Sequence, residues 1–202
     1  LKETFDNIRE MKIIGTFLIA FWMYEDGVAT IVRMAAKIAS SLGFAAGDII
    51  TAILMVQFIG FPAALGYNWF AKKIGTKNAV LVAIFGYVVI TFLGYLMTDI
   101  THFYILAALI GLFQGGIQSL SRSLFTRLVP PNKEAEFFGF YNMLGKFAAV
   151  VGPILVGWIT VLTGNPRAGI LSIVVLFIFG GLLLNRVDFK EGQRIAHDFG
   201  EN

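Results

Sequence analysis

The segment HFYILAALIGLFQGGIQSLSRSLFTRL, residues 102–128, decides the fold class. It is predominantly apolar and exceeds the roughly 20 residues that a helix needs to cross a hydrocarbon core about 30 Å thick. Within it Gln114, Gln118 and Arg122 recur at every fourth position, which places them on one face of a helix. An apolar helix with one polar stripe is typical of a membrane protein in which the stripe faces the protein interior or water.

The composition of the chain agrees with this interpretation. Of its 202 residues 57% are hydrophobic and 14% are charged, whereas about a quarter are charged in an ordinary soluble domain. Apolar runs of similar length recur, so we predict an all-α membrane protein that forms a single domain, residues 1–202, with a short tail at 186–202. The six predicted transmembrane helices lie at about residues 12–34, 48–70, 78–97, 102–128, 137–162 and 168–185.

The basic residues predict the orientation of these spans. With the N-terminus in the cytoplasm, the cytoplasmic segments hold most lysines and arginines, and the exterior loops hold only Lys37 and Arg167. Both termini are therefore expected in the cytoplasm, and the protein in the cell (inner) membrane. This distribution also explains the net charge of +3 without a nucleic-acid partner. Residues 187–202 fit either a helix on the membrane interface or a solvated tail.

Small residues follow two of the predicted spans. Gly111, Gly115, Ser119 and Ser123 form a ridge beside the polar stripe, and such a ridge lets a neighbouring helix approach closely. Residues 137–162 contain four glycines and Pro153. Because proline removes a backbone donor, the span either bends there as a gate or packs closely without motion.

Polar residues converge on the middle of the membrane when helix rise is counted at about 1.5 Å per residue. Ionised groups at that depth are costly and usually serve function, and a pair between Lys146 and a carboxylate is geometrically reasonable. The alternative for the glutamines is hydrogen bonding between helices. The residues predicted to bind solute or couple protons are Glu25, Asp26, Gln57, Gln114, Gln118, Asn142 and Lys146.

Three segments resemble a known family. NWFAKKIGTK, residues 68–77, is similar to the basic, glycine-containing loop of major facilitator superfamily transporters, although Asn68 and Lys72 replace the usual glycine and aspartate. MYEDGVATI, residues 23–31, and GLFQGGIQSLSRSLFTRLVPPNKEAEFFGFYNMLGK, residues 111–146, resemble the second half of its vacuole-effluxer-like group, whose best-known members export amino acids from vacuoles. The resemblance covers essentially the whole chain and implies helices seven to twelve of a twelve-helix carrier.

Charged residues near the cytoplasmic ends of the spans are predicted to form a gate. Arg122 lies deeper toward the cytoplasm than the other polar residues of its stripe. Because Lys72 replaces the aspartate of the family, a charge-swapped latch is expected from Lys72 or Lys73 to Glu134 or Glu136. Exposed pairs of this kind contribute about 0 to 1 kcal/mol each.

These observations predict one half of a secondary active transporter that moves a small polar solute, such as an amino acid, by alternating access. The expected partners are that solute, membrane lipids, and either the N-terminal six-helix half of the same carrier or a second copy. The alternative is a membrane scaffold or receptor whose polar residues only pack helices. No enzymatic activity, cofactor or metal is expected, since the chain has no cysteine and no nucleophile–base or metal-ligand spacing, with His102 at the very edge of a span and His197 outside the spans.

Overall fold

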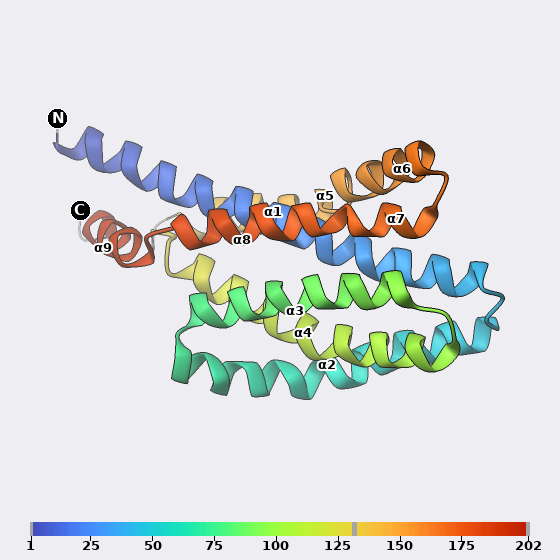
Figure 1. The fold of residues 1–202 in the computed structure, drawn as a ribbon. Coiled ribbons are helices and arrows are strands. Elements are labelled where there is room, and N and C mark those ends of the chain that lie inside the picture. The colour runs from blue at the N-terminus through green and yellow to red at the C-terminus, as the bar shows by residue number, and fades with distance from the viewer. Residues whose placement is uncertain (1, 131–132, 201–202) are drawn as a thin grey trace.

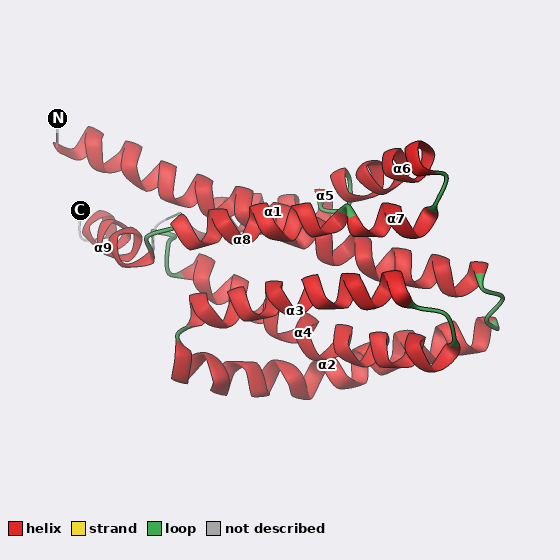
Figure 2. Cartoon of the chain, in the orientation of Figure 1, coloured by secondary structure: helices red, strands yellow, loops and turns green. Residues whose placement is uncertain are grey.

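The computed structural model describes residues 2–130 and 133–200, with side chains for residues 12–130 and 133–196. These described residues form helices joined by short turns and contain no strand (Figure 2). The predicted all-α fold is therefore confirmed. In chain order the helices are α1 (Lys2–Ser41), α2 (Ala46–Ile74), α3 (Thr76–Leu96), α4 (Ile100–Thr126), α5 (Glu134–Phe147), α6 (Val151–Thr163), α7 (Pro166–Leu171), α8 (Ile173–Arg186) and α9 (Phe189–Gly200).

The described residues contain five segments long and apolar enough to cross a membrane. They correspond to the second to sixth predicted spans. Helix α1 falls outside this set because Glu25 and Asp26 lower the hydropathy of its central turns, yet its 40 residues exceed the length that a span requires. The five segments are Ala46–Ile74, Thr76–Leu96, Ile100–Thr126, Glu134–Thr163 and Pro166–Arg186.

The fifth span, predicted at residues 137–162 with either a bend or close packing at its proline, is broken into two helices in its middle. Helix α5 ends at Phe147, α6 begins at Val151, and Ala149 between them has φ 75. Pro153 lies in the first turn of α6, where its missing N–H would have no intrahelical partner in any case. The proline therefore marks the start of a second helix. The sixth span is also divided, at Ser172 between α7 and α8.

Helices α2 and α4 approach each other closely through glycine. A Cβ atom added at Gly111 would lie 2.9 Å from the carbonyl oxygen of Val56, and one at Gly115 would overlap that of Gly60. The small-residue ridge predicted on this span is thus confirmed at its two glycines. Figure 1 shows the two helices running side by side.

Helix α1 runs through the bundle and contacts α4, α5, α6, α8 and α9 (Figure 1). Its aromatic side chains are central to this packing. The Phe21 ring stacks on Tyr141 of α5 at 4.2 Å between ring centroids, and Tyr141 stacks on Phe125 of α4 at 4.8 Å. Stacked pairs add roughly 0.5–1.5 kcal/mol beyond their burial. These rings fix α1, α4 and α5 against one another at the level of the polar residues.

The C-terminal tail is a helix packed on the bundle, which excludes the solvated tail considered from the sequence. The Asp188 carboxylate accepts hydrogen bonds from the backbone N–H groups of Lys190 and Glu191, both at 3.1 Å, and so caps the first turn of α9. Phe189 packs edge-on against Phe17 of α1, with 5.8 Å between centroids. In Figure 1 α9 is seen nearly end-on, at one end of the bundle.

Candidate functional site

Helices α1, α4 and α5 enclose an open cavity of about 440 Å³, here called the Glu25 cavity. It contains five residues that the sequence predicted as solute, coupling or gate residues, brought together from three helices. Helix α1 supplies one carboxylate, α4 supplies part of its polar stripe, and α5 supplies an amide and an amine. The lining residues are Phe21, Glu25, Gln118, Arg122, Tyr141, Asn142, Gly145 and Lys146.

The wall of the cavity is aromatic, which the sequence analysis did not predict. Phe21 and Tyr141, the stacked pair described above, both line it. A signal was present in the sequence, since Phe21 precedes Glu25 by four residues and therefore lies on the same face of α1. Beside this wall the buried hydroxyls of Tyr24 and Ser121 share a hydrogen bond of 2.7 Å, which joins α1 to α4.

The charges in the cavity are held apart. Glu25 Oε2 is buried and has no hydrogen-bond partner among the described residues. The Arg122 guanidinium lies over the Phe138 ring, 5.5 Å from its centroid, and Lys146 is exposed. No ion pair among the described side chains joins Glu25 to either cation, so the predicted pair with Lys146 is not formed in this conformation. An unpaired buried carboxylate oxygen is costly, and a bound partner would relieve that cost.

Asp26, adjacent to Glu25, lies outside the lining of the cavity and holds the break in the fifth span. Its carboxylate accepts hydrogen bonds from Val151 N at 2.8 Å and from Gly152 N at 3.0 and 3.1 Å. The Thr30 hydroxyl donates to it at 3.2 Å, and Asp26 is only 1% exposed. The first N–H groups of a helix lack intrahelical partners, so Asp26 caps α6 from a different helix.

Gly152 makes that approach possible. A Cβ atom at this position would lie 2.9 Å from Asp26 Oδ1 and would overlap the Thr30 hydroxyl. Any side chain here would push the start of α6 away from its cap. The sequence marked Gly152 as one of several glycines, but nothing in the pattern related it to Asp26.

The other predicted residues lie elsewhere. Gln114 is not among the lining residues of the Glu25 cavity, and its buried Oε1 has no hydrogen-bond partner among the described residues. Gln57 is exposed on α2. For the predicted latch, Lys73 Nζ lies 3.7 Å from the Trp69 ring centroid, and no ion pair among the described side chains links the two lysines to the glutamates. The four latch residues, all exposed, are Lys72, Lys73, Glu134 and Glu136.

Metal binding has no visible basis in the described residues, which contain no group of three or more His, Cys, Asp and Glu side chains that could hold an ion. The chemistry that the cavity offers is recognition by charge and hydrogen bonding: one carboxylate, two cations, two amides and an aromatic wall.

Comparison with known proteins identifies relatives of the whole chain. The profile of the family described as vacuole effluxer Atg22 like matches residues 1–197. A Bacillus subtilis (strain 168) protein, described as the uncharacterized MFS-type transporter YxiO, is 36% identical over 184 residues, which cover 91% of this chain and 43% of that protein.

Fungal proteins are similar over the full chain. Autophagy-related protein 22 of Coccidioides immitis is 29% identical over 221 residues, covering 100% of this chain and 36% of that protein. Autophagy-related protein 22 of Saccharomyces cerevisiae (strain S288c) is 27% identical over 217 residues, covering 100% of this chain and 40% of that protein. The chain thus spans less than half the length of these relatives.

Proposed function

Because the chain belongs to the family of Atg22-like vacuole effluxers, we propose that it forms one six-helix half of a secondary transporter that moves a small polar solute by alternating access. The other half would be the N-terminal six-helix bundle of the same carrier or a second copy of this chain. In this proposal the protein lies in the cell (inner) membrane with both termini in the cytoplasm, as the distribution of basic residues favours.

The observation that carries the proposal is a buried carboxylate oxygen of Glu25 that is left without a partner in the described part of the chain, beside an open cavity. That oxygen, Oε2, lacks a partner among the described residues, while Arg122 and Lys146 line the same space without an ion pair to it. A membrane scaffold would gain stability by pairing these charges, since an uncompensated buried charge is destabilising. A binding site instead keeps them available for a ligand.

The arrangement fits a zwitterionic solute such as an amino acid. Its ammonium group would bind Glu25, and its carboxylate would bind Lys146 or Arg122 from the facing helices. Gln118 and Asn142 would donate hydrogen bonds to, and accept them from, polar groups of the solute between its two charged ends. The Phe21 and Tyr141 wall would contact an apolar side chain. In the absence of solute, Glu25 would be free to exchange a proton and so couple transport to a proton gradient.

The break in the fifth span supports the proposal that α5 moves during transport. Helix α5 carries Asn142 and Lys146, whereas α6 is held on α1 by Asp26. In this proposal α5 bends at residues 148–150 while α6 stays on its cap, and the lining of the cavity changes as access alternates. Asp26 is thereby assigned to positioning and Glu25 to the solute or proton.

Transport by the full-length protein in proteoliposomes tests the proposal, with a panel of radiolabelled zwitterionic amino acids as probes. Glu25→Gln preserves shape and removes the charge. We expect flux to fall by about tenfold or more, the effect of losing one hydrogen bond to a charged group. The matched control is Asp99→Asn, which removes an exposed carboxylate outside the cavity while keeping a residue that caps α4 well.

Flux at the wild-type level in Glu25→Gln would refute the role of that carboxylate. If the wild-type protein moves no member of the panel, the amino-acid assignment is removed. Equal losses in both variants would indicate a general effect of surface charge and would also refute the site.

A further inference from the structure

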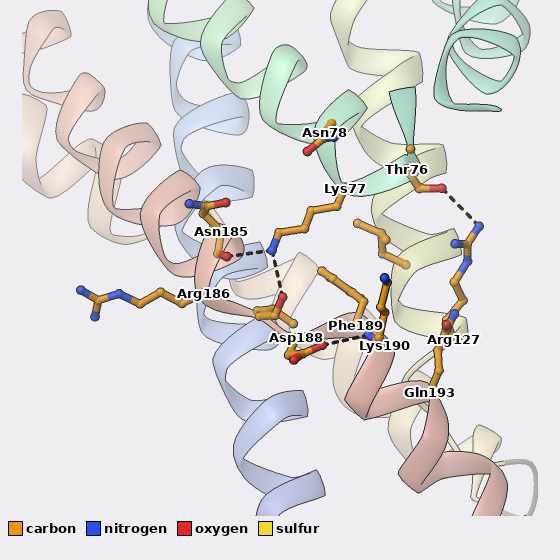
Figure 3. Close-up of a pocket in the computed structure, with 13 residues that line it drawn as sticks. Thr76, Lys77, Asn78, Arg127, Asn185, Arg186, Asp188, Phe189, Lys190 and Gln193 are labelled. Carbon is orange, nitrogen blue, oxygen red and sulfur yellow. Dashed lines mark hydrogen bonds between the residues drawn. The ribbon is translucent and has the colours of Figure 1, made fainter. Parts of the chain in front are cut away.

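A second cavity lies far from Glu25, at the end of the bundle where α9 packs. Its volume is about 640 Å³, and it lies between the start of α3, the end of α4 and the turn from α8 to α9 (Figure 3). We call it the α9 cavity. Four cationic residues line it, and Asp188 is its one acidic lining residue in the described part of the chain. The cations are Lys77, Arg127, Arg186 and Lys190.

The acidic residue offsets only one of the four positive charges, and its carboxylate also caps α9. Asp188 Oδ1 accepts from Lys190 N and Glu191 N, as the cap of α9. No ion pair among the described side chains joins Asp188 to a lining cation. The cavity therefore keeps an excess of positive charge.

Three of the cations have N–H groups that make no hydrogen bond within the described residues and can therefore bind an anion. Lys77 Nζ donates to the carbonyl oxygens of Asn185 at 2.7 Å and Val187 at 3.0 Å, which leaves one of its three N–H groups. Arg127 Nη2 donates to the Thr76 hydroxyl at 3.2 Å, which leaves the rest of its five N–H groups. The ammonium group of Lys190 has no hydrogen bond or ion pair within the described residues.

Figure 3 shows how these groups lie. The side chains of Lys190 and Arg127 reach toward the start of α3 from below, where Thr76 and Lys77 lie. Arg186 points away from the cavity, on the far side of Asn185. The Lys77 ammonium group is turned to the other side, toward the carbonyl oxygens of Asn185 and Val187, so Lys190 and Arg127 are the two cations whose side chains point the same way.

The position of the cavity matches the depth of lipid headgroups. The membrane-spanning segments Thr76–Leu96 and Pro166–Arg186 each have one end at this cavity. Leu124, Val187 and Phe189 add an apolar wall beside the cations. A cationic site with an apolar wall at the end of the spans suits a molecule with a phosphate and an apolar portion.

We propose that the α9 cavity binds a phosphate group through Arg127 and Lys190, supplied by the headgroup of an anionic phospholipid or by a free phosphate anion. Guanidinium and ammonium groups both bind phosphate strongly through charge-assisted hydrogen bonds. Binding joins the end of α4 to α9 through one anion and thereby secures α9 against the bundle. The inference does not depend on the proposed transport.

Native mass spectrometry of the full-length protein tests this site. The probes are phosphatidic acid, phosphatidylcholine with the same acyl chains, and inorganic phosphate as a competitor. Arg127→Gln and Lys190→Gln are each expected to weaken binding of phosphatidic acid by about tenfold. Arg186→Gln is the matched control, because it removes a cation of the same region that points away, and it should change binding less than about twofold.

The outcomes separate the two sources of phosphate. Displacement of phosphatidic acid by inorganic phosphate indicates a site for the free anion, and retention of the lipid indicates a headgroup site. Equal binding of the two lipids overturns the proposal, because it indicates lipid binding that does not depend on headgroup charge. Equal losses in Arg127→Gln and Arg186→Gln also overturn it, because they indicate diffuse surface charge. Lys190 is exposed and its ammonium group has no hydrogen bond or ion pair within the described residues, so Lys190→Gln keeps the test valid even if Arg127→Gln misfolds.

Discussion

Glu25 and Asp26 are adjacent carboxylates with different surroundings. Successive residues of a helix lie about 100° apart around its axis, so Glu25 faces the cavity while Asp26 faces the start of α6. Counting residues along the span gives both the same depth and cannot separate them. The separation depends on the break at residues 148–150, which exposes the N–H groups that Asp26 binds. The sequence therefore predicted two functional carboxylates where the structure has one in the cavity.

Replacing Asp26 should lower the stability of the protein, whereas replacing Glu25 should not. Asp26→Ala removes the acceptor of Val151 N and Gly152 N, and leaving buried donors unpaired costs about 1–3 kcal/mol. We expect its thermal unfolding midpoint, followed by tryptophan fluorescence in detergent, to fall. Glu25→Gln should keep the wild-type midpoint or exceed it, because no partner of Oε2 is lost. An Asp26→Ala protein with unchanged stability but abolished transport would instead assign Asp26 to the solute or proton site.

Close contact between α2 and α4 shows what spacing predicts at the level of helices. The four-residue repeat of small residues on α4 predicted a close neighbour, and Gly115 confirms it. The identity of that neighbour was not predicted: Gly60 and Ala64 of α2 also lie four residues apart, but a small-residue spacing does not show which helix it packs against. Likewise the proline of the fifth span predicted a disturbance, but the full break requires Asp26, which is far away in sequence. Local pattern specifies the faces of helices, and tertiary contacts specify their partners.

Glycine-to-alanine substitutions should therefore change stability in opposite directions at two helical positions. At Gly115 the added methyl group would overlap the Gly60 carbonyl oxygen, a backbone atom that cannot rotate away, and overpacking costs about 1–3 kcal/mol. At Gly157 of α6 nothing lies within 4 Å of the added atom, and alanine favours a helix by about 1 kcal/mol over glycine. We expect Gly115→Ala to lower the unfolding midpoint and Gly157→Ala to maintain or raise it. Equal midpoints would show that α2 and α4 are not in close contact in the membrane.

At the scale of the whole molecule, the distribution of basic residues predicts which end of the bundle lies in the cytoplasm. The chain has no cysteine, so single cysteines can report accessibility once any cysteines elsewhere in the protein are replaced. Lys133, in the turn between α4 and α5, and Ser40, in the last turn of α1, are exposed residues. Figure 1 shows the end of α4 and the end of α1 at opposite ends of the bundle. In intact cells a membrane-impermeant maleimide should label Ser40→Cys and should label Lys133→Cys only after permeabilisation. Positive charge near span ends disfavours translocation, and α9, with the cationic cavity, would then face the anionic cytoplasmic leaflet. The reverse labelling pattern would place the α9 cavity outside the cell and would contradict the predicted orientation.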